Sequence, residues 1–129
     1  MIMHFISLAE AAALNARYRQ HHENILKEAY QGQNILPLSE TFDRYAVDTV
    51  LEKPGCTGLR VYYGMTEDLA VHAVMVGVDE NNRDILPVTT GTSAAAAGET
   101  DEEDGFILER AIRCPDLCPD SSPLNSDGL

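Results

Sequence analysis

The sequence contains no tryptophan and few basic residues, with nine lysines and arginines against 21 aspartates and glutamates among 129 residues. The formal net charge is −12. The nine bases are scattered singly and form no basic stripe. Binding a nucleic acid requires clustered basic side chains that displace counterions, so this composition argues against nucleic acid as a partner. The scarcity of bases argues equally against anionic membrane surfaces.

Long apolar runs are also missing. No stretch approaches the ~20 residues that a membrane-spanning helix requires. The apolar start, residues 1–6, lacks the basic beginning of a signal peptide and is soon followed by Glu10, so it is not a convincing secretory signal. Three cysteines cannot all pair within one chain, which fits a reducing compartment. We therefore expect a cytoplasmic protein.

Catalytic motifs are absent as well. The glycines match neither a phosphate-binding loop nor a dinucleotide-binding fingerprint. The four histidines have no serine, cysteine or acid at a spacing that predicts a general base. The sequence predicts no catalytic residue and favours a non-enzymatic protein.

The acidic residues that are present concentrate near the end of the chain. Residues 1–98 hold 7 bases and 12 acids, a balance of −5, and residues 99–129 hold 2 bases and 9 acids, a balance of −7. This asymmetry predicts a body over residues 1–98 and an acidic C-terminal segment over 99–129. An acidic inhibitor or immunity-type protein that masks a basic partner is one hypothesis that rests on this charge.

The body begins with two predicted helices. Ser7 and Glu10 form a capping box that opens an alanine-rich stretch, and apolar residues at three- and four-residue steps predict a helix from about 8 to about 29. A second helix is expected from the N-cap Ser39 to near Glu52, because Lys53 precedes a proline.

The following residues change to the period of a β-strand. Strands are predicted over 57–65, 69–78 and 83–88, separated by turn residues. The expected fold is α+β, with two N-terminal helices packed on a small antiparallel meander, followed by an acidic tail containing proline and cysteine. The edges of such a small sheet need covering by the tail or by another copy of the chain.

Two sets of residues are candidate sites. Cys114 and Cys118 lie four residues apart and, with Cys56, could ligate zinc or iron, with a fourth ligand from His21, His22 or His72. A thiol-redox pair and incidental thiols are the alternatives, and no cofactor is implied in the latter case. If Leu59, Val61 and Tyr63 face the core, Arg60 and Tyr62 point the other way, and arginine with tyrosine is typical of interaction hot spots.

The segment Pro54-Gly55-Cys56-Thr57-Gly58-Leu59-Arg60-Val61-Tyr62-Tyr63-Gly64-Met65 and the terminal Cys-Pro-x-x-Cys-Pro resemble a family of small bacterial proteins of about this length. The resemblance implies that the helix, meander and cysteine-tail layout is a recurring unit, and it brings no activity or substrate. The leading hypothesis is thus a protein-interaction or self-assembly module, a homo-oligomer or a binder of a protein partner, and the alternative is a cysteine-based metal or redox protein.

Overall fold

The computed structural model describes residues 4–87 and 105–126. The chain forms two compact units: Met1–Ser39 together with Arg113–Leu129, and Glu40–Ile112. The predicted boundary at residue 98 and the acidic run 99–104 lie outside the described residues. The first unit therefore combines segments from both ends of the sequence, and the second is a continuous stretch between them.

The first unit contains the helix α1 (Leu8–His21) and the short 3₁₀ turn η1 (Glu28–Tyr30). Ser7 caps α1 as predicted, since its hydroxyl accepts the Glu10 N–H. The prediction that this helix continues to residue 29 is wrong. The His22 N–H still donates to Tyr18 O, but the His22 ring nitrogen Nδ1 lies 3.2 Å from Arg19 O, the carbonyl that the next helical amide would use.

The second helix, α2 (Arg44–Leu51), starts later than predicted. Its N-cap is Asp43, whose carboxylate accepts the Ala46 N–H at 2.8 Å, so the prediction of Ser39 as N-cap is wrong. Ser39 instead begins the strand β1 (Ser39–Thr41), which pairs with β5 (Ile112–Cys114) in a two-stranded sheet. A strand that pairs with residues so distant in sequence cannot be recognised from its neighbouring residues, so Ser39 resembled a helix cap. Asp43, which lies directly before the helix, is an equally good capping residue.

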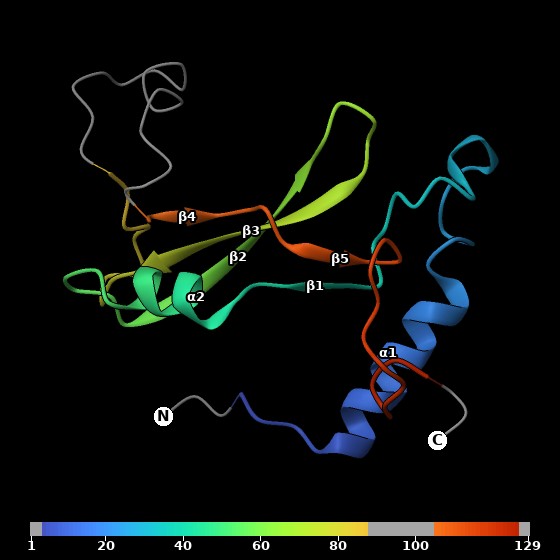
Figure 1. Ribbon diagram of the computed structural model, residues 1–129, viewed down its shortest axis with the longest axis horizontal. Coiled ribbons are helices and arrows are strands. Elements are labelled where there is room, and N and C mark those ends of the chain that lie inside the picture. The colour runs from blue at the N-terminus through green and yellow to red at the C-terminus, as the bar shows by residue number, and fades with distance from the viewer. Residues whose placement is uncertain (1–3, 88–104, 127–129) are drawn as a thin grey trace. The chain divides into compact units, whose positions relative to one another are not determined.

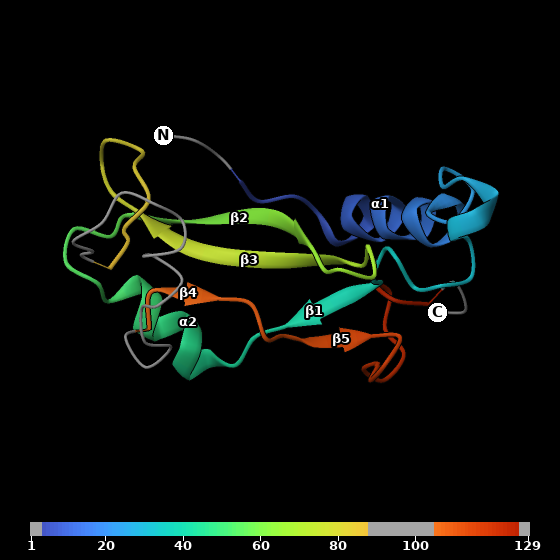
Figure 2. The same cartoon turned by 90° about the horizontal axis from the view of Figure 1, so that it is seen from above.

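The second unit is built on the hairpin of β2 (Gly58–Met65) and β3 (Val71–Val78), which confirms the two central predicted strands (Figure 1). The sheet is antiparallel, in the order β2-β3-β4. Its third strand is β4 (Ile107–Leu108) beside β3 (Figure 2). The prediction of a third strand over 83–88 is wrong for its described part, residues 83–87, where Asp84 forms an isolated bridge to Val78 and the other residues are irregular.

The core of the second unit lies where α2 contacts β3 and β4. Val50 of α2 is fully buried and lies against Gly77 of β3, while Val76 is buried on the other face of the sheet, the face of its partner Arg60. A β-carbon at Gly77 would lie within 3.5 Å of the Val50 side chain, so glycine permits this close approach. The chain is thus an α+β protein with α2 packed on the sheet, while α1 belongs to the other unit.

Candidate functional site

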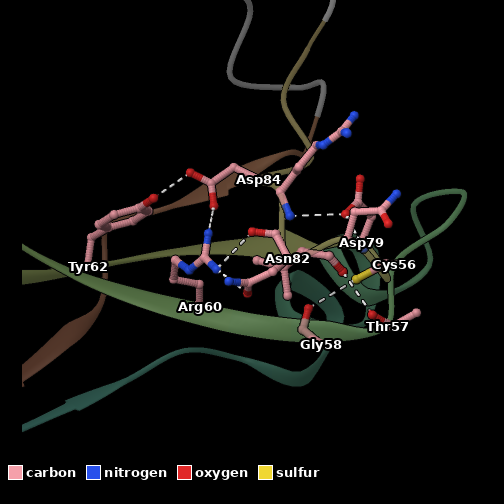
Figure 3. Close-up of polar contacts among 11 residues, drawn as sticks. Cys56, Thr57, Gly58, Arg60, Tyr62, Asp79, Asn82 and Asp84 are labelled. Atoms are coloured by element: carbon pink, nitrogen blue, oxygen red, sulfur yellow. Dashed lines mark hydrogen bonds and ion pairs between the residues drawn. The ribbon is translucent and has the colours of Figure 1, made fainter.

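The two predicted interaction residues, Arg60 and Tyr62, are both bonded to Asp84 (Figure 3). The Arg60 guanidinium lies 2.5 Å from Asp84 Oδ1, and the Tyr62 hydroxyl donates to Asp84 Oδ2 at 2.5 Å. Arg60 also donates to the backbone and side-chain oxygens of Asn82, at 3.1 and 2.5 Å. The two side chains therefore share one face of β2 and hold the turn after β3 against it.

That turn has its own support. The Asp79 carboxylate accepts the backbone N–H groups of Asn81 and Arg83, and Asn82 has the positive φ of 64° that asparagine tolerates. Ile85 N–H then donates to Gly77 O, which returns the chain to the sheet. The run of Asp and Asn residues predicted the turn, but no sequence pattern assigned Asp84 to Arg60 and Tyr62, 24 and 22 residues away.

The electrostatics of this cluster hold Arg60 in its charged form. The hydrogen bond to Tyr62, followed by the hydrogen bond to Asp84 and the charge of that carboxylate, raises the pKa of Arg60 above its ordinary value. A raised pKa for a base adds stability below the unfolded-state pKa, which is lost only as pH rises through the folded-state value. Arg60 therefore contributes no pH dependence near neutrality. Its charge is satisfied within the chain.

The opposite face of the hairpin is apolar and open. Leu59, Val61, Tyr63 and Met65 project from β2 on this face, beside Val71, Ala73 and Met75 of β3. We call these seven residues the apolar face. Leu59, Val61 and Tyr63 alternate with Arg60 and Tyr62 as predicted, yet they are not core residues: Tyr63 is 81% exposed and Met65 61%. The helix α2 covers this face at its Gly77 end. At the other end, near Tyr63 and Met65, no described element of the unit covers it.

The two edges of this sheet differ. Along β3, where β4 is too short to pair with its first half, Glu40 accepts the Ala73 N–H at 2.7 Å and Glu109 lies 2.6 Å from His72 Nδ1. These carboxylates cap one edge, and the sequence did not indicate them. On the other side, β2 has no neighbouring strand among the described residues. Its eight residues therefore present an edge strand to solvent within the unit.

The three cysteines are divided between the units. Cys114 and Cys118 form a disulfide in the first unit. Cys56 is a free, half-buried thiol in the second unit, and its sulfur lies 3.2 Å from Gly58 O (Figure 3). Over residues 4–87 and 105–126, no three His, Cys, Asp or Glu side chains converge as a metal site. A disulfide sulfur is not a thiolate ligand, so the metal site predicted at Cys56, Cys114 and Cys118 stays a prediction about the reduced chain.

No protein-family model, curated protein or solved structure matches the chain. The resemblance to a family of small bacterial proteins consequently stays a prediction. In the described segments, every helix is too short or too polar to cross a membrane.

Proposed function

We propose that this protein is a non-enzymatic self-assembly module that adds a second copy of itself at the outer edge of β2. The observation that carries the proposal is an eight-residue edge strand whose apolar side chains are half or more exposed at its far end. Native proteins rarely leave such an edge open without charges, proline or a bulge. Addition of a strand at an exposed edge uses the free backbone groups for affinity and the side chains for selectivity.

If the β2 strands of two copies of the chain pair antiparallel about a two-fold axis, the residue on that axis lies opposite the same residue of the other copy. A pair centred on Val61 sets Arg60 opposite Tyr62 of the second copy, on the polar face. It also sets Leu59 opposite Tyr63 of the second copy, on the apolar face. Aromatic and aliphatic cross-strand pairs stabilise a sheet, and a guanidinium is attracted to a tyrosine ring. A pair centred on Arg60 would instead oppose two guanidinium groups, which is unfavourable.

Charge on the strand does not oppose this arrangement, because Arg60 is the one charged residue between Thr57 and Met65 and is already paired with Asp84. The net charge of −12 opposes it at longer range. Added salt screens that repulsion, so self-association should strengthen with ionic strength. A basic partner would show the opposite dependence, which separates self-assembly from the acidic-inhibitor hypothesis.

Val61→Lys tests the proposal by placing a charge at the centre of the edge strand. We expect sedimentation equilibrium to show a dimer for the natural chain and at least tenfold weaker association for the variant, because about 1.5–3 kcal/mol accompanies burial of a valine and 1.4 kcal/mol is tenfold. Ile25→Lys is the matched control, since Ile25 is 76% exposed in the other unit. A natural chain that stays monomeric at high micromolar concentration would overturn the proposal.

The register has a separate test. Paired residues on antiparallel strands have Cα atoms about 4.5–5.5 Å apart, which suits a disulfide. In a Cys56→Ala background, Val61→Cys should therefore cross-link to its own copy under mild oxidation, and Leu59→Cys should not. Cross-linking of Leu59→Cys alone would show a different register.

The cytoplasmic location predicted from the cysteine count belongs with this proposal. It is supported by the free thiol of Cys56. In a reducing compartment, a disulfide such as Cys114–Cys118 is usually one that exchanges with other thiols.

A further inference from the structure

The disulfide of the first unit has one sheltered and one accessible half. Cys114 ends β5 and is 6% exposed. Its carbonyl accepts the Leu38 N–H at 2.8 Å, which fixes the residue against the chain that leads into β1. Cys118 lies in the loop after β5 and is exposed, and so are its neighbours Leu117 and Pro119. The bond thus joins a fixed, buried residue to one on an open loop.

Thiol–disulfide exchange depends on which sulfur a thiolate can reach. Burial of Cys114 blocks approach to its sulfur, whereas the exposed loop admits a nucleophile at the Cys118 sulfur. We infer that the Cys114–Cys118 disulfide is a site of thiol–disulfide exchange with a protein dithiol. The atom that the incoming thiolate attacks is Cys118 Sγ. This inference stands independently of self-assembly through β2, because it concerns residues of the other unit.

The exchange balances in two steps. A thiolate of the dithiol forms a bond to Cys118 Sγ, and the Cys114–Cys118 bond breaks with its electron pair on Cys114 Sγ, which then takes a proton. The second thiol of the co-substrate, after losing its proton, attacks the first thiol's sulfur and releases Cys118 as a thiolate. The dithiol is oxidised to a disulfide, and Cys114 and Cys118 are reduced to two thiols.

Reduction would remove the cross-link between the end of β5 and Cys118 in the loop that follows it. Asn15 and Arg19 of α1 each donate a hydrogen bond of 3.0 Å to Leu124 O in the tail beyond this loop. Both end on one backbone oxygen, and both are exposed. Within the loop, the Leu117 N–H donates to Arg113 O at 2.8 Å, so reduction would free the Cys118 end of the loop while this hydrogen bond remains.

The natural chain provides the first test, with a thioredoxin that lacks its resolving cysteine as the probe. We expect a mixed disulfide that peptide mass spectrometry maps to Cys118, while Cys56 remains a free thiol. Native reduction by dithiothreitol should raise the number of titrating thiols from one to three. A bond that opens only in denaturant is a structural disulfide, and that result would overturn the inference, as would a mixed disulfide at Cys114.

Single-cysteine reactivity supplies the second test. Cys114→Ser leaves the thiol of Cys118, and Cys118→Ser leaves that of Cys114. In a Cys56→Ala background, we expect alkylation of Cys118 to be at least tenfold faster than that of Cys114. Equal rates in two variants that both keep the circular dichroism of the natural chain would contradict the difference in access.

Discussion

Gly77→Ala tests the contact between β3 and the segment that follows α2. A β-carbon at this position would lie 2.8 Å from Cys56 Sγ and 3.4 Å from Val50 O. The sulfur or the strand must then move, and overpacking of this kind costs about 1–3 kcal/mol. Alanine also reduces the conformational entropy of the unfolded chain, which stabilises the folded state by roughly 0.4–1 kcal/mol. We expect the free energy of unfolding of the second unit to fall by about 1–2 kcal/mol.

Urea denaturation followed by far-UV circular dichroism measures this change. The control is Gly64→Ala in β2, where the nearest atom to the added carbon is a methyl group of Val74 at 3.3 Å, which can shift more easily. Cys56→Ala removes the sulfur that the added β-carbon would contact. The double variant Gly77→Ala/Cys56→Ala should therefore be about 1 kcal/mol more stable than the sum of the two single effects predicts. Additive effects within about 0.3–0.5 kcal/mol would refute the proposed clash between the two side chains.

Two further predictions concern contacts in the same unit, and a third concerns the net charge of the chain. Tyr62→Phe removes the hydroxyl that donates to Asp84, so hydrogen exchange at the amides of residues 79–85 should accelerate while that of α1 stays unchanged. Gly105→Ala should lower the free energy of unfolding by more than about 1 kcal/mol in a thermal or urea melt, because Gly105 has φ of 68° and the added carbon would lie 2.6 Å from the Thr49 methyl. Raising the salt concentration should tighten self-association in sedimentation equilibrium, and loosening would indicate a basic partner.

The parts of the fold that local patterns govern could be predicted. The β2–β3 hairpin follows from β-branched residues on both sides of a short turn, and the Ser7 cap follows from its spacing to Glu10. The pairing of β1 with β5, and of β3 with β4, joins residues that no short motif relates. The third strand and the start of α2 were misplaced for this reason.

For the candidate surface on β2, too, the local pattern could be predicted and the tertiary contacts could not. Alternation along β2 correctly separated Arg60 and Tyr62 from Val61 and Tyr63. It could not indicate which face is covered, because that depends on where α2 packs and on the turn that carries Asp84. Exposure of an apolar strand face is a tertiary property, and the sequence alone favoured burial for it.

The division of the chain into units has a consequence for its synthesis. The middle unit, Glu40–Ile112, is continuous and can fold as soon as it leaves the ribosome. The other unit needs residues from 113 onward to meet α1, which precedes the middle unit in the sequence, since Leu124 O accepts hydrogen bonds from Asn15 and Arg19. The helix α1 is therefore translated before the middle unit, and its partner segment is translated after it. While the middle unit is being translated, α1 lacks this partner segment, and the Cys114–Cys118 disulfide can form only after the middle unit has been made.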